Sequence, residues 1–436
     1  MSMYPSVRNI PDVGPPAAAD HTTPPARGRQ ALKMAATGNV IAIGATSLIT
    51  DLSSEMVAAV IPLFLTAQVG LGVAAFGLFD GAYQAATILL RLWGAGIADR
   101  TRRHKQVAVA GYGISAGARV GLALAAVAAV PALLIDRVGK GLRAAPRDAL
   151  ISMSAPPTVT ATAFGIHRTM DTIGALGGPL LAFGILAVTA DAFDAVFTAS
   201  AMIGLAGLAV VVLTVDPHPP YTGTAGHDTP GHDTPAAKPS WLTETRSVLA
   251  VPGLKRLAVT AGGLAAVSVS DAFVYLVIAD QADMDPKLFP LLFAGTALAY
   301  LSLAVPFGRA ADRYGAKKVF LAGHAALIFV YLTVAAADLT AVTVAVVVAV
   351  GGAYWAATDG VTSALATKAA PARHRAAAIA VVSVAVAVGR FVSSVAFGAA
   401  WTTWGPTAAF ALFAAALAVA LLAAAIALRP DPATGT

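Results

Sequence analysis

The chain has 436 residues, of which 57% are hydrophobic and only 12% are charged, and its formal net charge is +6. Soluble domains carry about a quarter charged residues, and so few charges cannot cover the surface of so long a chain in water. The composition therefore excludes an ordinary soluble protein. Cysteine is absent, which excludes disulfides and thiolate metal sites.

Apolar windows long enough to cross a bilayer follow one another along the chain. A membrane-spanning helix needs about 20 mostly apolar residues. Such windows lie at 38–67, 72–97, 106–130, 131–153, 160–188, 191–215, 256–280, 288–311, 318–338, 340–366, 376–402 and 406–428. Their small residues recur at spacings that let helices approach closely. We therefore predict an all-α membrane protein with twelve transmembrane helices packed as a bundle.

A polar stretch separates the sixth window from the seventh. It is rich in Pro, Gly, His and Thr and contains the pentapeptide Gly-His-Asp-Thr-Pro twice in tandem, which is typical of a disordered linker. The linker divides the helices six and six, as in transporters built from repeats. We expect a disordered cytoplasmic N-terminus at 1–35, six-helix bundles at 36–215 and 251–428, the linker at 216–250 and a cytoplasmic tail at 429–436.

Lys and Arg are concentrated on one side of the predicted bundle. If the N-terminus is inside, the cytoplasmic segments contain almost all of the loop bases, and the opposite side contains only Lys287. Residues 1–35 have no apolar core, so we expect the first helix to act as its own insertion signal. These patterns predict a multi-pass protein of the inner (plasma) membrane with both termini cytoplasmic. The dispersed bases explain the net charge without a nucleic-acid partner.

Two short loops, after the second and eighth windows, each combine an acid with several bases. They resemble the loop signature G-x-L-A-D-R-x-G-R-[RK] of the major facilitator superfamily. The first loop matches at Asp99, Arg100 and Arg103, and the second at Gly308, Asp312, Arg313, Gly315 and Lys317. The first loop departs from the pattern where the superfamily has glycine. The resemblance implies that these loop residues act in gating.

The fourth and fifth windows contain further motifs of the same superfamily. Leu133-x-x-x-Arg137-x-x-Lys140-Gly-x-Arg143-Ala-Ala resembles the pattern L-x-x-x-R-x-x-Q-G-x-G-A-A of proton-coupled members. Gly174-x-x-x-Gly178-Pro179 partly resembles the Gly-Pro motif of drug:proton antiporters. The resemblance spans about residues 40–428. It implies an efflux permease with two six-helix bundles that rock about a central cavity.

Ionisable residues within the windows are the candidates for proton coupling, because a charge at mid-membrane costs at least about 2.5–3.5 kcal/mol. Asp51 and Glu55, four residues apart in the first helix, predict a proton site. The alternatives are a structural ion pair with a base of the fourth or fifth helix and a location at the membrane interface. His167 and Asp171 predict a proton relay or, alternatively, a hydrogen-bonded pair that fixes two helices. Asp271 lies in the seventh helix, the repeat counterpart of the first, and Asp359 in the tenth, the counterpart of the fourth. The alternative for each is an ion pair with Arg390.

A second group of charges predicts the substrate. We assign the candidate substrate and cavity residues to Arg137, Lys140, Arg143, Asp359 and Arg390. Asp136, Lys140, Arg143 and Arg147 recur on one face of the fourth helix, which must look inward because a lipid-facing stripe of charge is too costly. We predict an anionic substrate bound by Lys140 and Arg143 and released when the first-helix acids reionise. The alternative is that these bases only pair with acids to fix packing.

The predicted function is secondary active transport, as proton-coupled efflux of a small molecule by alternating access. We expect a monomer in the lipid bilayer whose partners are protons and a small-molecule substrate, with no cofactor and no metal. An enzyme is not expected, since the sequence contains no Ser-His-Asp spacing, Walker loop or zinc-protease pattern. Two alternatives are a proton- or sodium-coupled importer with the same fold and a non-transporting membrane receptor or assembly factor. The receptor or assembly factor does not require so many ionisable groups within helices.

Overall fold

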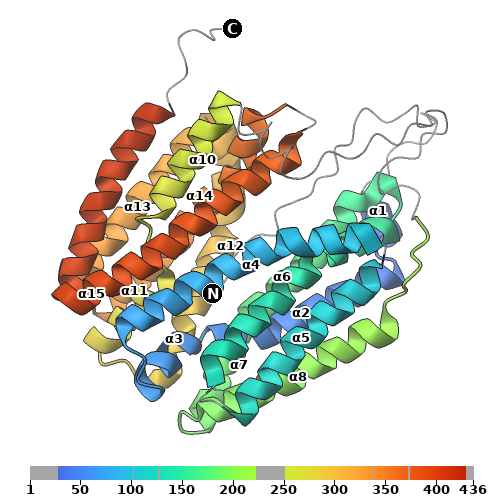
Figure 1. Ribbon diagram of the computed structural model, residues 1–436, viewed down its shortest axis with the longest axis horizontal. Helices are drawn as coiled ribbons and strands as arrows, with labels where there is room; N and C mark the ends of the chain where they lie inside the picture. Colours follow the sequence, from blue (N-terminus) through green and yellow to red (C-terminus); the bar gives the residue numbers. More distant parts are fainter. Residues whose placement is uncertain are drawn as a thin grey trace. The chain divides into compact units, whose positions relative to one another are not determined.

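The computed structural model describes residues 28–101, 103–125, 128–221, 251–336, 338–371 and 374–428. These residues are helical almost throughout, and no strand occurs among them (Figure 1). Each predicted window falls on helix, and the last two windows share α15 (Arg375–Ala427), whose helical conformation is interrupted between them at Gly405 (φ 81°). The predicted all-α membrane fold is therefore confirmed.

The helices follow the predicted windows closely in both halves of the chain. Before the linker they are α1 (Arg29–Ala35), α2 (Gly38–Ala58), α3 (Ile61–Leu63), the π-helix η1 (Phe64–Gln68), α4 (Val73–Thr101), α5 (His104–Leu124), α6 (Ala129–Ser154), the 3₁₀ turn η3 (Pro157–Val159), α7 (Thr160–Val188) and α8 (Phe193–Thr214). After the linker they are α10 (Pro252–Ala265), α11 (Asp271–Gln281), the 3₁₀ turn η4 (Pro286–Leu288), α12 (Phe289–Tyr314), α13 (Ala316–Ala336), α14 (Ala341–Ala369) and α15 (Arg375–Ala427). Among the described residues, nine segments are long and apolar enough to cross a membrane. The helix α6 is of similar length but is richly charged.

The structure corrects the prediction of one continuous helix over 256–280. The helix α10 ends at Ala265 and α11 begins only at Asp271. The break is stabilised because the Val269 N–H donates to the Tyr331 hydroxyl at 2.6 Å and the Ser270 Oγ accepts from the Ala272 N–H at 3.4 Å. These bonds satisfy backbone groups that the helix ends leave without partners. An apolar pattern does not reveal such a break.

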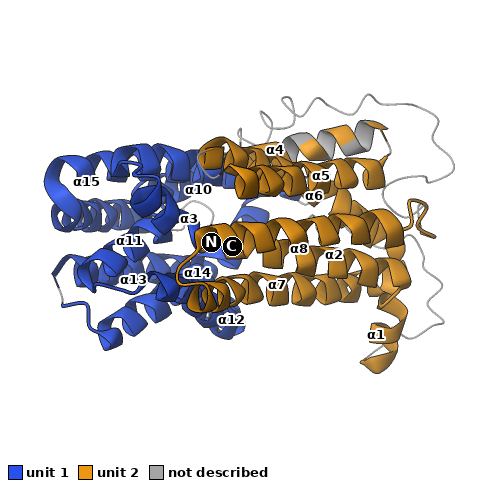
Figure 2. Cartoon of the chain, turned by 90° about the horizontal axis from the view of Figure 1, so that it is seen from below, with its two compact units in different colours: residues 1–12, 60–85, 239–436 blue, residues 13–59, 86–238 orange. Residues whose placement is uncertain are grey.

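The described chain divides into two compact units (Figure 2). Among the described residues, the N-terminal unit comprises those within 28–59 and 86–221, and the C-terminal unit comprises those within 60–85 and 251–428. The helix α4 therefore contributes its first half, up to Ala85, to the C-terminal unit and the remainder to the N-terminal unit. The predicted bundles at 36–215 and 251–428 remain a prediction about the repeat, since the compact units follow packing instead of chain order.

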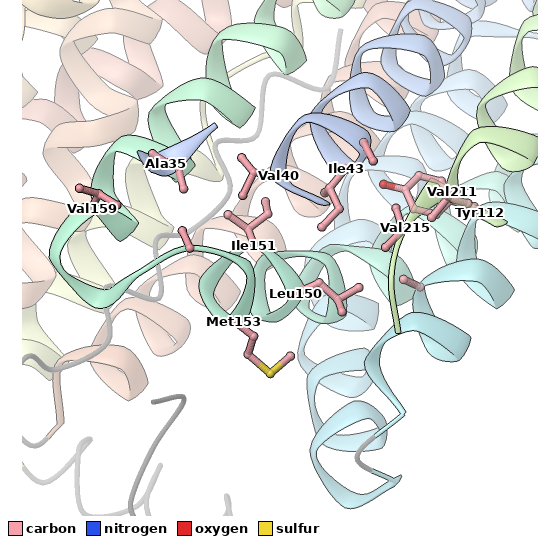
Figure 3. Packing of buried hydrophobic residues seen from close by; sticks show 14 of the residues in the cluster. Ala35, Val40, Ile43, Tyr112, Leu150, Ile151, Met153, Val159, Val211 and Val215 are labelled. Atoms are coloured by element: carbon pink, nitrogen blue, oxygen red, sulfur yellow. The ribbon is translucent and has the colours of Figure 1, made fainter. Parts of the chain in front are cut away.

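An apolar cluster joins the helix ends of the N-terminal unit (Figure 3). It includes Val40 and Ile43 of α2, Ile151 of α6 and Val211 of α8. Next to it, the Thr37 Oγ1 accepts from the Val40 N–H at 3.3 Å, which caps α2, and donates to the Ser154 carbonyl at 2.9 Å. The start of α2 is thereby fixed against the end of α6.

Glycines bring the helices of the N-terminal unit into close contact. A Cβ added at Gly174 of α7 would collide with the Leu48 carbonyl of α2, and one at Gly178 would lie 2.7 Å from the Met56 nitrogen. Small residues let helix backbones approach in this way. The motif glycines of α7 thus set the distance at which α2 presents its polar face.

Candidate functional site

The charged face of α6 lies against α2, α5 and α7 within the N-terminal unit. Asp136, Arg137 and Arg143 are buried, and Lys140 and Arg147 are only partly exposed. Each of these side chains forms an ion pair with a described residue. The face that sequence spacing predicts to look inward therefore packs against protein.

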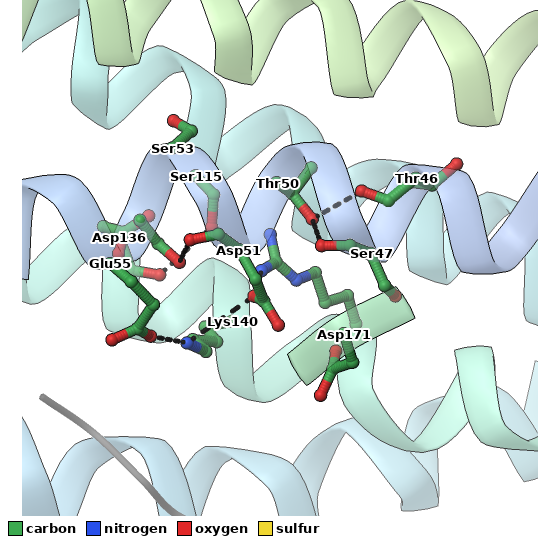
Figure 4. Close-up of polar contacts among 12 residues, drawn as sticks. Thr46, Ser47, Thr50, Asp51, Ser53, Glu55, Ser115, Asp136, Lys140 and Asp171 are labelled. Atoms are coloured by element: carbon green, nitrogen blue, oxygen red, sulfur yellow. Dashed lines mark hydrogen bonds and ion pairs between the residues drawn. The ribbon is translucent and has the colours of Figure 1, made fainter. Parts of the chain in front are cut away.

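Lys140 contacts both acids of α2, Asp51 and Glu55 (Figure 4), and Arg143 contacts Asp51. The Lys140 Nζ donates to the Glu55 Oε1 at 2.8 Å and lies 3.7 Å from the Asp51 Oδ1. The Arg143 Nη2 lies 3.5 Å from the same Asp51 oxygen. Two bases and two carboxylates therefore form one small cluster whose formal charges cancel when all four are ionised. We refer to Asp51, Glu55, Lys140 and Arg143 as the four-charge cluster.

The four-charge cluster leaves hydrogen-bonding capacity unused. Within the described residues, the buried Glu55 Oε2 and Arg143 Nη1 have no hydrogen-bond partner. The Arg143 side chain is 2% exposed and its guanidinium lies 4.5 Å from the centre of the Tyr112 ring, whereas the Lys140 side chain is 18% exposed. Buried polar atoms are normally satisfied, so an unused donor and an unused acceptor within one cluster mark a candidate binding site.

Asp136 forms a second network, deeper among α2, α5 and α6. Its carboxylate accepts from the Arg119 Nη2 at 3.0 Å and from the Arg137 Nη2 at 2.9 Å. Arg119 also donates to the Ser53 hydroxyl at 2.9 Å, and Ser53 in turn contacts Ser200 of α8. One carboxylate paired with two buried guanidiniums connects four helices, which is typical of a structural network.

Arg147 connects the predicted relay residues of α7. It lies 3.7 Å from the Asp171 carboxylate and donates to the Ser47 hydroxyl at 3.4 Å, and Ser47 lies 2.9 Å from the His167 Nε2. His167 and Asp171 are thus joined through Arg147 and Ser47.

The candidates in the C-terminal unit meet at an aromatic side chain. The Trp355 Nε1 donates to the Asp271 Oδ2 at 2.8 Å, and the Arg390 guanidinium lies 4.4 Å from the centre of a Trp355 ring. Asp359, one turn further along α14, accepts from the Tyr300 hydroxyl at 3.1 Å. The Asp271 carboxylate thus accepts from an indole N–H and the Asp359 carboxylate from a phenol O–H.

The two signature loops differ in what the structure describes. Asp99 and Arg100 lie in α4, but their side chains fall outside the described residues, and Arg103 precedes α5 as its N-cap. In the second loop, Gly308, Asp312 and Arg313 are exposed on α12. Gly315 ends that helix with φ of 100°, a conformation that favours glycine, and the Lys317 Nζ donates to the Leu428 carbonyl at 2.9 Å. Pro179 lies within α7 directly after Gly178.

Sequence reasoning missed three side chains that connect the charged residues. Ser47 lies four residues before Asp51, and Trp355 four residues before Asp359, so helical spacing is the signal that could have found both. Tyr112, in contrast, reads as an ordinary residue of an apolar helix. Within the described residues, no group of three His, Cys, Asp or Glu side chains is placed to bind a metal ion.

Comparison with known proteins assigns the chain to a family. The family model described as Major Facilitator Superfamily matches residues 43–277 and 257–436. An uncharacterized MFS-type transporter of Methanocaldococcus jannaschii is 28% identical over 294 residues, which cover 66% of this chain and 69% of that protein. An uncharacterized protein of Mycobacterium tuberculosis is 33% identical over 150 residues, which cover only 34% of this chain and 37% of that protein.

Solved structures with the same fold include two transporters. The nucleoside transporter NupG superposes with a TM-score of 0.74 at 13% identity, covering 91% of this chain and 100% of that chain. A peptide transporter POT superposes with a TM-score of 0.70 at 17% identity, covering 89% of this chain and 94% of that chain. At such identities the likeness concerns the fold alone.

Proposed function

The chain belongs to the major facilitator superfamily and is a transporter of that type, and we propose that it moves a small organic anion together with protons by alternating access. The observation that carries this proposal is the four-charge cluster. In it Lys140 and Arg143 are neutralised by Asp51 and Glu55, while Arg143 retains an unused donor.

Proton binding and anion binding support each other in this arrangement. When Asp51 and Glu55 are ionised, they occupy the two bases and repel an anion. When they bind protons, the two bases become a site of net positive charge, and the freed donors of Lys140 and Arg143 match a carboxylate or phosphate. Since each ligand favours the other, both occupy the transporter at once and cross in the same direction. An inward proton gradient then drives uptake of the anion.

Proton-driven efflux is the second candidate, and a different observation favours it. The Glu55 Oε2 is a buried acceptor without a hydrogen-bond partner among the described residues, and the Gly174, Gly178 and Pro179 motif resembles that of drug:proton antiporters. A cationic substrate that replaces protons at Asp51 and Glu55 competes with them, as antiport requires. Substrate charge and direction of transport are therefore linked.

The sign of the proton movement separates the two candidates. Purified protein is reconstituted into liposomes that contain a pH-sensitive dye, and carboxylates, phosphate monoesters or organic amines are added outside. Anion–proton co-transport acidifies the lumen when an anion is added, whereas cation–proton exchange makes it alkaline when an amine is added. A pH change of neither kind across the panel contradicts proton coupling of these substrate classes.

The matched variants are Asp51→Asn and Glu55→Gln, which keep shape and hydrogen-bonding capacity but do not titrate. We expect the pH signal to be lost in both variants, while counterflow of labelled substrate without a gradient persists. If both variants still move protons as the parent does, the proton site lies elsewhere, with Asp171 and Asp271 next to be tested.

We also propose that both termini are cytoplasmic, as the distribution of Lys and Arg predicts. Because the native chain has no cysteine, single cysteines report orientation without background. In intact cells Ser240→Cys should be protected from an impermeant thiol reagent, and Asp283→Cys should react. The opposite labelling pattern contradicts this orientation.

A further inference from the structure

Asp80 of α4 is a buried acid that the proposed function does not use. Its side chain accepts hydrogen bonds from the Ser394 hydroxyl at 2.6 Å, the Gln84 Nε2 at 2.8 Å and the Ser270 hydroxyl at 3.2 Å. Ser394 lies on α15 and Ser270 caps α11. All four residues belong to the C-terminal unit, so the carboxyl group joins three helices within one compact body.

The contact around Asp80 is closely packed. One turn before it, Gly77 lies so close to α15 that an added Cβ would collide with the Ser394 carbonyl. On the same stretch of α4, the ring centroid of Phe76 lies 5.3 Å from that of Phe273. The Phe273 centroid lies 4.9 Å from the ring centroid of Phe397. Asp80 itself is only 7% exposed. A close glycine contact and edge-to-face aromatic rings thus pack the stretch of α4 that carries the acid against α11 and α15.

Charged and titratable neighbours are present, but none neutralises Asp80. Within the described residues, no Lys, Arg or His forms an ion pair with it, and its partners are two hydroxyls and an amide. Asp271, at the start of α11, is a second acid of the same unit, Arg390 of α15 lies over the Trp355 ring, and Tyr83 lies on α4 itself. An ionised Asp80 here would be a desolvated charge without a counter-ion, which costs several kcal/mol.

We propose that Asp80 is a proton-binding site, and that its protonated form stabilises the packing of residues 73–85 of α4 against α11 and α15. The neutral carboxyl donates one hydrogen bond and accepts others, which the hydroxyls of Ser394 and Ser270 complement because each can donate or accept. When α4 separates from α15, water reaches the acid and it ionises. Closing this contact therefore binds one proton, and opening it releases one.

This inference rests on the chain being a transporter and is independent of the proposed substrate. It adds a proton site in the C-terminal unit to the one proposed at Asp51 and Glu55 in the N-terminal unit. By linkage, low pH favours the packed state, and rising pH favours separation by up to about tenfold per pH unit for one coupled proton.

Thiol accessibility without substrate tests the site. Phe76→Cys places a reporter in the closed contact of the otherwise cysteine-free chain. Its labelling rate in liposomes is measured over a pH series and divided by the rate in denatured protein at the same pH. In the parent background we expect this ratio to rise at least tenfold from acidic to alkaline pH. A ratio that does not change with pH overturns the proposal.

Asp80→Asn is the decisive second background, because its carboxamide imitates the protonated acid. We expect the labelling ratio to stay low at every pH. A labelling ratio that rises with pH as much as in the parent overturns the proposal. So does a high labelling ratio at every pH, provided that the variant elutes from size-exclusion chromatography as a folded protein.

Two further backgrounds separate a proton site from a packing defect. Asp271→Asn keeps Asp80 and should retain the pH-dependent rise, and loss of the rise in this variant alone assigns the proton to Asp271. Ser394→Ala keeps the carboxyl but removes one hydrogen bond, so it should retain the rise and shift it to lower pH. Since no substrate is added, these results do not depend on the anion experiment.

Discussion

The two compact units bury their acids in different ways. In the N-terminal unit, Asp51, Glu55 and Asp136 each contact a base of α5 or α6 at 2.8–3.7 Å. In the C-terminal unit, Asp80 and Asp271 accept hydrogen bonds from hydroxyl, amide and indole groups. A paired acid can exchange its partner for another charged group, whereas an acid among neutral donors can change only by binding or losing a proton. The first arrangement suits a binding site and the second a protonation switch.

The largest expected effect is on the Asp136 network. Asp136→Asn removes the charge that neutralises Arg119 and Arg137, and leaving buried guanidiniums without a counter-ion costs about 3–5 kcal/mol. We expect a marked fall in the unfolding temperature of the purified protein. The matched control is Asp285→Asn, which breaks the exposed pair with Lys287 at 2.6 Å and should cause no measurable loss. Equal stability of the two variants would contradict the structural role of Asp136.

A smaller effect is expected at the four-charge cluster. Lys140→Gln and Arg143→Gln each remove a charge-assisted contact worth about 1.5–3 kcal/mol, so binding of the transported anion should weaken roughly 10- to 100-fold. The control is Lys318→Gln, which changes an exposed lysine on α13. Unchanged affinity combined with lower thermal stability would mean that the two bases serve packing alone. The four-charge cluster would then not be a substrate-binding site.

The distance between α2 and α7 offers a third test. Gly174→Ala inserts a methyl group against the Leu48 carbonyl, and overpacking of this kind costs about 1–3 kcal/mol. Gly184→Ala on the same helix meets no atom within 4 Å and serves as the control. We expect only the first variant to lose stability, as measured by thermal unfolding. Loss in both variants would point to an effect of alanine on α7 that is unrelated to helix contact.

The smallest expected effect is in the C-terminal unit. Asp271→Asn keeps an oxygen that accepts from the Trp355 Nε1, so the hydrogen bond survives and stability should change by no more than about 1 kcal/mol. The measurement is the same thermal unfolding used for Asp136→Asn. If the two substitutions cost equally, the distinction between ion-paired and neutrally bonded acids fails.

Sequence reasoning predicted the helices well but predicted their partners poorly. Each apolar window falls on helix, and the family expected from the loop signature is confirmed by the family model. The break at 266–270 was not predicted, because it depends on the Tyr331 hydroxyl of a different helix. The spacing of Asp51 and Glu55 predicts a shared face, but it does not decide between a proton site and an ion pair. Both acids prove to contact Lys140, while their role in transport remains a proposal.

The sequence by itself determined that this chain is a helical membrane protein, where its helices lie, and which face of α6 is charged. These properties are local, since apolarity and helical period are set by residues within a few turns of one another. The tertiary structure alone decided which acid meets which base and that residues 60–85 pack with the second half of the chain. An ion pair requires two atoms within about 4 Å, and the chain brings Lys140 to Glu55 across 85 positions of sequence. No local pattern encodes that approach, because it results from the packing of whole helices.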